Sequence, residues 1–445
     1  MMELDRIGSR IGRFRRRDRG GAASRPRVRS MPVPPSSFRA LGVVAALLAP
    51  ITSTQAQPAR EEAQPLRLAA ISFADLPGWS QENPAELLGG LIANCNAIRA
   101  FRDRPLGGEG FVAERAGTAA NWTEACDAIR ALPATLPRIV PGDGRRTQAA
   151  ARARNNAMRG MLERHFAAYA AGPGVMTGYY EPVLRGATAP SETHRTPLLA
   201  PPPELGARPS PILPASLPRG PRPNPVPDRA AIEDGALSGR SLEIVWVDDA
   251  ADAYFLHIQG SGRVMLPDGT MLRIGFAAQN GHPYVPLARV ALEAGMPRDR
   301  LSMQGMRAWL REVGAERASE LMRRNPSYIF FRRVEGLSPE QGPIGAMGVP
   351  LTPRRSVAVD RAFIPLGLPL FVAARDPLDR RPFGRIVLAQ DTGGQIRGAT
   401  RTDFFWGWGD EAGERAGRMY EEAQVFLLLP RPAPLERIEV AQLPN

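Results

Sequence analysis

The 445-residue sequence contains no lysine, only two cysteines and only four histidines. The histidines are scattered without the spacing of a metal site, so we expect neither a metal nor any other cofactor. There is also no Gly-x-Ser-x-Gly elbow, phosphate-binding loop or dinucleotide fingerprint. The serine hydrolase, kinase and Rossmann classes are therefore without support. The four histidines are His165, His194, His257 and His282.

All the basic residues are arginines, and they give the chain a formal net charge of +12. Residues 1–56 hold eleven of the arginines against three acidic residues, which accounts for +8 of that charge. Because the location of charge decides what it attracts, the remainder of the chain is close to an ordinary balance. We therefore expect no nucleic-acid partner.

Residues 1–56 have the pattern of an export signal. A basic stretch precedes the apolar "ALGVVAALLAPI", and "TSTQAQ" then offers small residues for cleavage after Ala56. The apolar run of about 12 residues is too short to span a bilayer. Translation could start at Met1 or at Met31. A start at Met31 would give a signal peptide of conventional length. Since no cysteine follows the run for lipid attachment, we expect a soluble periplasmic protein without a stable membrane anchor, associated at most with the cell wall or outer membrane.

Cys95 and Cys126 lie in similar surroundings, "LIANCNAIRAF" and "WTEACDAIRAL". In an oxidising compartment an even pair favours a disulfide. The alternative is two small buried apolar side chains, and the sequence leaves both open.

The apolar periodicity divides the chain into a helical part and a β-rich part. Residues 84–170 repeat apolar residues at helical spacing, and residues 201–227 hold eleven prolines, which predicts an extended loop. Beyond them, short β-branched and aromatic runs such as "LEIVWV", "FLHIQGSGRV" and "GRIVLAQD" predict strands, and "PDG" at 267–269 predicts a hairpin turn. A helical interval, "SMQGMRAWLREVG" and "ASELMRRN", interrupts them. The sequence therefore predicts a mainly β protein of barrels with an N-terminal helical segment.

Three aspartates, Asp360, Asp391 and Asp403, stand at the ends of predicted strands or in the loops that follow. Such positions present side chains to a cleft, although Asp beside Gly is also typical of simple turns. "DTGG" contains the Asp-Thr-Gly triplet of aspartic proteases, but no second copy exists to share the proton. We interpret Asp410 as an exposed turn or helix-capping residue.

Several longer stretches occur in one order between about residues 170 and 425: "TGYYEPVLRG", "QGSGRV…DG…NGHPY", "NPSYIFFR", "SVAVDRAFIPLG" and "AQDTGGQIRGATRTDFFWGWGDEAG". Together they resemble the membrane-bound lytic murein transglycosylase A family with its three-aspartate domain. The resemblance implies a double-psi β-barrel domain with a second, smaller β-barrel domain inserted. The first would comprise residues 57–182, which include the helical part, together with the three-aspartate domain 335–430. The insertion would comprise 183–334 with the proline-rich loop, and 431–445 would form a tail.

The same resemblance implies cleavage of the β-1,4 bond between N-acetylmuramic acid and N-acetylglucosamine in peptidoglycan, without water, to give a 1,6-anhydro product. If the sugar's C6 hydroxyl is the nucleophile, one carboxyl group can act first as general acid and then as general base. The family's acid matches Asp403, whose pKa the flanking Phe404, Phe405 and Trp406 would raise by desolvation. Asp391 and Asp360 would orient backbone or stabilise the transition state, or be structural.

For sugar binding we expect Tyr179 and Tyr180, because aromatic faces stack on pyranose rings, although either can equally be core. Gln259, Ser261 and Gly262 are the polar candidates, and Asn280 and Tyr284 are weaker ones. The expected partner is a peptidoglycan glycan strand held by a monomer in a cleft between the domains. Two alternatives stay open: an inactive peptidoglycan-binding protein, and a hydrolytic muramidase that uses Asp403 and Asp391 with water.

Overall fold

The computed structural model describes residues 66–139, 144–205 and 226–432. The export signal, most of the proline-rich loop and nearly all of the C-terminal tail lie outside these described residues. Within the described ranges, no helix has both the length and the apolar character needed to cross a bilayer.

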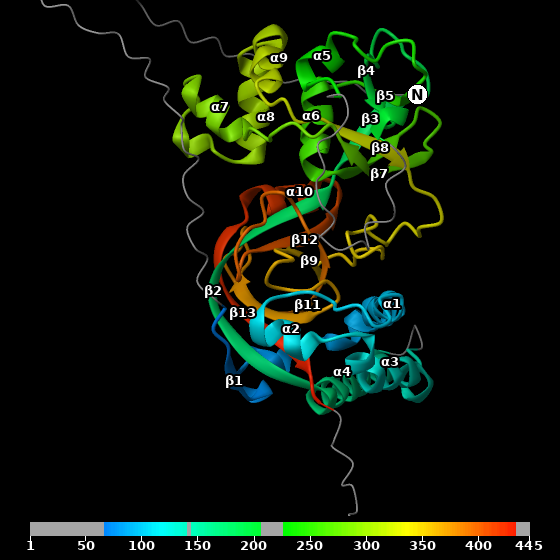
Figure 1. The fold of residues 1–445 in the computed structure, drawn as a ribbon, viewed down its shortest axis with the longest axis vertical. Coiled ribbons are helices and arrows are strands. Elements are labelled where there is room, and N and C mark those ends of the chain that lie inside the picture. The colour runs from blue at the N-terminus through cyan, green and yellow to red at the C-terminus, as the bar shows by residue number, and fades with distance from the viewer. Residues whose placement is uncertain (1–65, 140–143, 206–225, 433–445) are drawn as a thin grey trace, which may run out of the picture. The chain divides into compact units, whose positions relative to one another are not determined.

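The larger sheet closes into a ring. Seven strands follow one another in the order β1-β2-β12-β9-β11-β10-β13, and a further pairing of β2 with β13 joins the ends of six of them (Figure 1). The long β2 makes this possible, because residues 166–177 pair with β13 on one side, while β1 and then β12 pair with β2 on the other. This ring confirms the predicted β-barrel, and the double-psi crossing of its loops stays a prediction. Its strands are β1 (Ala69–Ile71), β2 (Phe166–Glu181), β9 (Ser356–Val359), β10 (Pro369–Arg375), β11 (Pro382–Asp391), β12 (Thr402–Trp408) and β13 (Tyr420–Pro430).

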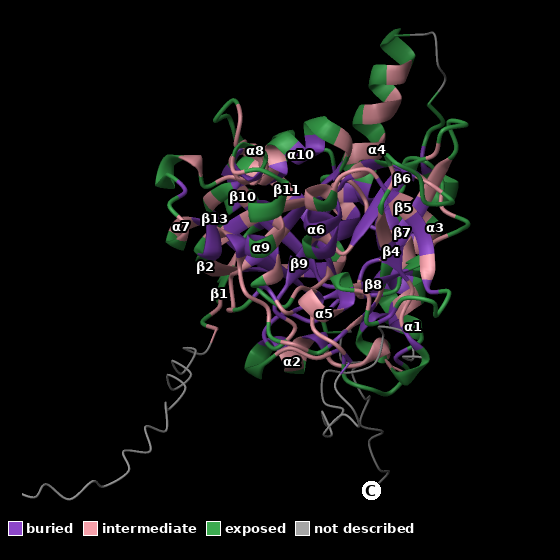
Figure 2. Ribbon diagram, turned by 90° about the horizontal axis from the view of Figure 1, so that it is seen from above, coloured by how far each residue is buried: buried purple, intermediate pink, exposed green. Residues whose placement is uncertain are grey.

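Helices from the N-terminal part pack beside this barrel. Their apolar faces join the strand residues in one hydrophobic core, and Figure 2 shows their outer surfaces exposed while the strands are mostly buried. A disulfide joins Cys95 in α1 to Cys126 in α3, with the Cα atoms 5.5 Å apart, which decides between the two alternatives for these cysteines. The helices are α1 (Leu88–Arg99), α2 (Gly110–Ala116), α3 (Thr123–Thr135) and α4 (Gly144–His165).

The predicted third helix is wrong at its C-terminal end. The helical spacing continues to about Tyr169, but α4 ends at His165 and β2 begins at Phe166. Residues 166–170 pair with β13, and 168–170 also with β1, so sheet hydrogen bonds outweigh the local helical preference of "FAAYA".

The second sheet has six strands in the order β4-β5-β3-β6-β7-β8, all from the middle of the chain. The "PDG" hairpin is confirmed between β6 and β7, where Gly269 has a φ of +84° and Asp268 accepts a hydrogen bond from Thr270 N. We propose that this sheet is the inserted domain of residues 183–334, and its closure into a smaller barrel stays a prediction. The strands are β3 (Val183–Ala187), β4 (Thr196–Leu199), β5 (Glu243–Val247), β6 (Ser261–Met265), β7 (Met271–Gln279) and β8 (Ile329–Arg333).

The predicted strand "FLHIQGSGRV" is a helix in its first half and a strand only in its second half. Residues 250–259, "AADAYFLHIQ", form α6, and β6 begins only at Ser261. Asp249 caps the helix by accepting from Ala251 N and Asp252 N, and Gly260 ends it in the left-handed region. Apolar and aromatic composition alone misled the prediction, whereas the Asp and Gly at the two ends are helix signals.

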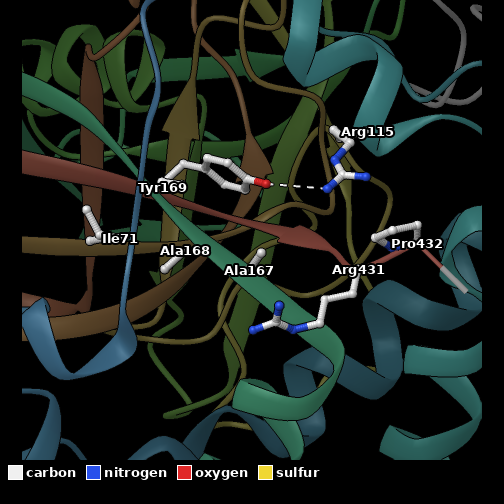
Figure 3. A pocket seen from close by; sticks show the side chains of 8 residues that line it. Ile71, Arg115, Ala167, Ala168, Tyr169, Arg431 and Pro432 are labelled. Carbon is white, nitrogen blue, oxygen red and sulfur yellow. Dashed lines mark hydrogen bonds between the residues drawn. The ribbon is translucent and has the colours of Figure 1, made fainter. Parts of the chain in front are cut away.

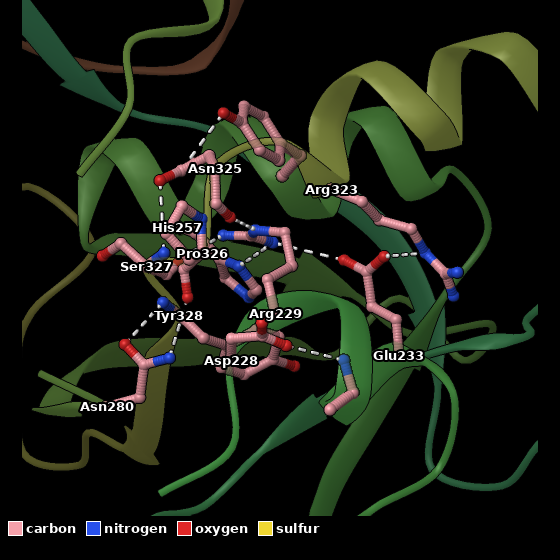
Figure 4. A network of polar contacts seen from close by, with 12 residues as sticks. Asp228, Arg229, Glu233, His257, Asn280, Arg323, Asn325, Pro326, Ser327 and Tyr328 are labelled. Atoms are coloured by element: carbon pink, nitrogen blue, oxygen red, sulfur yellow. Dashed lines mark hydrogen bonds and ion pairs between the residues drawn. The ribbon is translucent and has the colours of Figure 1, made fainter. Parts of the chain in front are cut away.

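The remaining helices are α5 (Arg229–Glu233), α7 (Leu287–Glu293), α8 (Met303–Glu312), α9 (Ala315–Arg323) and α10 (Gly409–Arg418). The helical interval predicted from "SMQGMRAWLREVG" and "ASELMRRN" is confirmed by α8 and α9. In this part of the chain, the buried Arg229 donates to the carbonyls of Asn325 and Ser327 and contacts His257 Nδ1 (Figure 4). These contacts join α5, α6 and the segment before β8 into one folded unit.

Candidate active site

A row of directly paired residues crosses five neighbouring strands of the barrel and includes Asp403. Asp403 lies opposite Thr177 on β2 and opposite Ala358 on β9. The row continues to Asp391 beyond Ala358 and to Tyr420 beyond Thr177. Because directly paired residues project from the same face of a sheet, these side chains share one face. Asp403 is therefore the second residue of β12 and does not follow a strand as the sequence suggested, since β12 pairs on both sides at residues 402–404.

The carboxyl group of Asp403 is held by one hydroxyl. Thr177 Oγ1 donates to Asp403 Oδ1 at 2.5 Å. The hydroxyl oxygen of Thr177 in turn accepts a hydrogen bond from the guanidinium of Arg401 at 2.8 Å. Because Arg401 can only donate, the threonine proton must point to the carboxylate. Burial raises the pKa of Asp403 to about 6, with the charge of Asp391 adding to the rise, while Thr177 and Arg401 oppose it.

Of the three aromatic residues expected to desolvate Asp403, only Phe405 shares its face of β12, while Phe404 and Trp406 belong to the barrel core on the other face. Phe404 and Phe405 are fully buried, and Phe405 shares the face of Asp403 two residues along the strand. Desolvation as the cause of a raised pKa therefore agrees with the sequence-based expectation, whereas the catalytic role of Asp403 stays a proposal.

Asp391 is the last residue of β11, and its carboxyl group accepts three hydrogen bonds. Ala346 N and Thr392 N donate to Oδ1, at 3.0 and 2.9 Å, and the Tyr179 hydroxyl donates to Oδ2 at 3.1 Å. Burial raises the pKa of Asp391 in spite of these donors. A carboxylate so fully occupied is suited to hold backbone and charge in place and has little room for proton exchange with a ligand.

Tyr179 connects the two aspartates. It pairs with Phe405 across β2 and β12, and the two rings lie 5.2 Å apart between centroids. Burial raises the pKa of Tyr179 well above its ordinary value, and the charges of Asp391 and Asp403 raise it further. The tyrosine is therefore a neutral donor whose position is fixed by both neighbours.

Asp360 organises the loop between the other two aspartates. It follows β9 directly, is buried, and accepts from Ala362 N at 3.1 Å and from Gly398 N at 2.9 Å. Gly398 belongs to the loop that leads into β12. These contacts favour the backbone-orienting role among those expected for Asp360.

The expected sugar-binding residues differ in burial and in their hydrogen-bond partners. Gln259 Oε1 accepts from Tyr180 N at 3.1 Å, so the end of α6 contacts the end of β2. Tyr180 is only 5% exposed and belongs to the barrel core, which favours the core alternative for this tyrosine. Ser261 and Gly262 are buried at the start of β6, where a Cβ on Gly262 would meet Leu256 at 2.4 Å.

The weaker candidates and Asp410 also have local explanations. Asn280 is buried and bonds the carbonyls of Pro227 and Pro326 and the amide of Tyr328, while Tyr284 is half-buried (Figure 4). Asp410 is exposed in the first turn of α10, where a carboxylate is favoured by the helix dipole.

Sequence reasoning missed a buried ion-pair cluster at the end of β2. Glu181 is bonded by Arg263 at 2.8 Å and by Arg273 at 3.0 Å, and all three side chains are buried. Arg263 also donates to the carbonyls of Pro339 and Gln341, on the segment that leads back to the barrel strands. The charged residue in "YYEP" directly after an aromatic pair was the available signal.

Two other features do not contribute to the row. Across the described ranges, no group of histidine, cysteine, aspartate and glutamate side chains is arranged to hold a metal ion. A surface pocket is lined by residues of β1, the start of β2, Arg115 and Arg431, and contains none of the three aspartates (Figure 3).

Comparison with known proteins gives two matching family models. The MltA specific insert domain matches residues 175–332, and the 3D domain matches residues 355–429, which include all three aspartates. The membrane-bound lytic murein transglycosylase A of Escherichia coli strain K12 is 32% identical over 265 residues. That alignment covers 58% of this chain and 66% of the relative, just under two thirds of its length.

Solved structures extend the similarity. The crystal structure of a membrane-bound lytic murein transglycosylase from Agrobacterium tumefaciens has a TM-score of 0.66 and 32% identity, covering 82% of this chain and 98% of that chain. The structure of E. coli MltA with bound chitohexaose has a TM-score of 0.55 and 26% identity, covering 78% and 90%.

Proposed function

Since this chain belongs to the membrane-bound lytic murein transglycosylase A family, we propose that it is a lytic transglycosylase of peptidoglycan. The reaction is cleavage of the β-1,4 bond between N-acetylmuramic acid and N-acetylglucosamine, with release of 1,6-anhydro-muropeptides. The observation that carries the proposal is the half-buried Asp403, whose pKa is raised to about 6 beside a neutral tyrosine and a second carboxyl group.

The mechanism needs one group that can give a proton and take one back. Asp403, protonated, donates to the oxygen of the leaving N-acetylglucosamine as the glycosidic bond breaks. The resulting carboxylate then takes the proton of the C6 hydroxyl as that oxygen closes on C1 of the muramic residue. A pKa near the working pH serves both steps, because neither the acid nor the base form is far from populated.

The hydrogen bonds around Asp403 assign the proton to one oxygen. Oδ1 accepts from Thr177, so the transferable proton sits on Oδ2. Arg401 fixes the threonine hydroxyl. Asp391, held by Tyr179 and two backbone amides, supplies a negative charge that favours the protonated form of Asp403 and stabilises positive charge developing at C1.

We further propose that Tyr179, Gln259, Ser261 and Gly262 contribute to the glycan site. Tyr180 does so through its backbone, since its amide bonds Gln259 and its ring is in the core. The protein acts as a monomer on glycan strands on the periplasmic side of the envelope.

Mass spectrometry of the soluble products from purified sacculi tests this function. Non-hydrolytic cleavage gives muropeptides lighter by one water molecule than the products of a muramidase. Products with reducing muramic ends would favour the two-carboxylate hydrolytic scheme, and glycan binding without products would favour an inactive binding protein.

A further inference from the structure

Few large aromatic side chains are exposed in the described part of the chain. They are Phe111, Phe276, Trp408 and Tyr420. Trp408 lies on β12, the strand of Asp403, and Tyr420 lies on β13, which is separated from β12 by β2. Because a large exposed aromatic ring is more informative than a small exposed apolar one, this placement needs an explanation.

Tyr420 shares the row of Asp403. It is the first residue of β13, lies directly opposite Thr177, and is 76% exposed. Thr177 in turn lies opposite Asp403. Two strand spacings separate Tyr420 from Asp403, about 10 Å between Cα atoms, and both side chains leave the same face.

A β-bulge brings Trp408 to that face as well. Phe405 pairs with Tyr179 and Trp408 pairs with Glu181, so three steps along β12 match two steps along β2. Without the extra residue, Trp408 would point to the opposite side from Asp403 and Phe405. Gly407, with a φ of +116°, supplies the backbone conformation that the bulge requires.

The indole of Trp408 contacts a buried arginine and is partly exposed to solvent. The guanidinium of Arg263 lies 4.2 Å from the ring centroid, and Arg263 is itself held by the buried Glu181. The side chain nevertheless keeps 44% of its surface exposed. A ring held in place by a fixed cation can offer its exposed surface to a ligand with little further loss of side-chain freedom on binding.

We propose that Trp408 and Tyr420 are two aromatic platforms that stack on sugar rings of the glycan strand, Tyr420 across the strands from Asp403 and Trp408 along the strand direction. The partners of Asp403 and Trp408 on β2, Thr177 and Glu181, are four positions apart along the strand, which is about 13 Å. That distance is more than one pyranose ring, so Trp408 binds a sugar residue away from the cleaved bond, while Tyr420 binds one closer to it. The inference rests on the proposed function and names the residues that hold its substrate.

Calorimetric titration with chitohexaose tests the proposal, using the mature protein and its Trp408→Ala, Trp408→Phe, Tyr420→Ala and Phe111→Ala variants. We expect both Ala variants at the platforms to weaken binding about tenfold, while Trp408→Phe keeps most of the affinity. Phe111, 43% exposed on α2, is the matched control and should bind as wild type. On sacculi, the two Ala variants should raise KM with little change in kcat.

Unchanged affinity in both Ala variants would overturn the proposal, and a loss in only one would overturn the two-platform arrangement. Equal losses in Trp408→Ala and Trp408→Phe would also overturn it, because a purely structural role of the indole against Arg263 would then explain the effect. The proposed function is tested separately. If wild-type protein binds chitohexaose through Trp408 but releases no anhydro-muropeptides, the aromatic platforms are supported and the proposed reaction is overturned.

Discussion

Asp391 and Asp403 lie opposite the same residue, Ala358, on the two sides of β9. Two strand spacings hold their Cα atoms about 10 Å apart with both side chains on one face. The charge of Asp391 acts on Asp403 across this distance, and it contributes to the raised pKa of Asp403. Replacing a neighbour of Asp403 should therefore change the pKa of Asp403.

Replacement of Asp391 by asparagine should lower the pKa of Asp403. Asn keeps an oxygen for Ala346 N and Thr392 N but removes the negative charge. A general acid is active only when protonated, so activity falls as the pH rises through its pKa. In Asp391→Asn this fall in activity should begin about one pH unit lower than in wild type. The measurement is kcat/KM against pH on soluble glycan. An unshifted basic limb would show that Asp391 does not act on the acid.

Replacement of Thr177 by valine should have the opposite effect. The hydroxyl of Thr177 stabilises the ionised form of Asp403, so its loss raises the pKa and moves the basic limb upward by about one unit. Thr177→Ser keeps the donor and is the control, with a profile close to wild type. Limbs that move in the same direction in Thr177→Val and Asp391→Asn would contradict this account.

How much of this site the sequence could predict differs between its residues. The identity of Asp403 followed from the motif around it, and the desolvating neighbours followed from "DFFW". The position of Tyr420 did not, because β13 meets β2 only through a pairing across more than 200 residues of chain, and sequence periodicity carries no information on such a register.

The fold shows the same division. Strands β5 and β11 were predicted from "LEIVWV" and "GRIVLAQD", because a short run of β-branched and aromatic residues indicates a strand without knowledge of its pairing partners. The start of β2 at Phe166 and the helix α6 were missed, since pairing partners and caps decided those segments against their apolar composition. The bulge at Gly407 has a single-glycine signal that does not by itself tell a bulge from a turn.

The raised pKa of Asp403 also has a consequence for stability. The folded state keeps its proton up to a pH of about 6, whereas the unfolded chain releases it at about 3.9. The stabilisation is therefore complete at low pH and is lost as pH rises through 6. We expect Asp403→Asn to increase the free energy of unfolding by about 1–3 kcal/mol at pH 7.5 and by only about 0.5 kcal/mol at pH 4.

Urea unfolding of the wild type, Asp403→Asn and Asp410→Asn at both pH values measures this effect. Asp410 is exposed and its replacement should change little at either pH. A gain for Asp403→Asn that is equal at pH 4 and pH 7.5 would mean that side-chain shape, not the ionised carboxylate, causes it.

The disulfide between α1 and α3 should stabilise the helical part that packs on the barrel. Its cysteines are 31 residues apart, and closing a loop of this length in the unfolded chain corresponds to about 3–4 kcal/mol. The double variant Cys95→Ala/Cys126→Ala should unfold at a correspondingly lower urea concentration. Wild-type protein treated with dithiothreitol is the control and should lose a similar amount. An unchanged midpoint in both would show that packing of α1 and α3 holds this part without the bond.

The central claim is that a single carboxyl group, Asp403, performs both proton transfers. The most direct measurement compares the muropeptides released from purified sacculi by wild type, Asp403→Asn and Asp410→Asn, by mass spectrometry at pH 6. We predict anhydro-muropeptides from wild type and Asp410→Asn, and from Asp403→Asn a rate lower by about 10²-fold or more. Anhydro-muropeptides released by Asp403→Asn at a rate near that of wild type would contradict the claim.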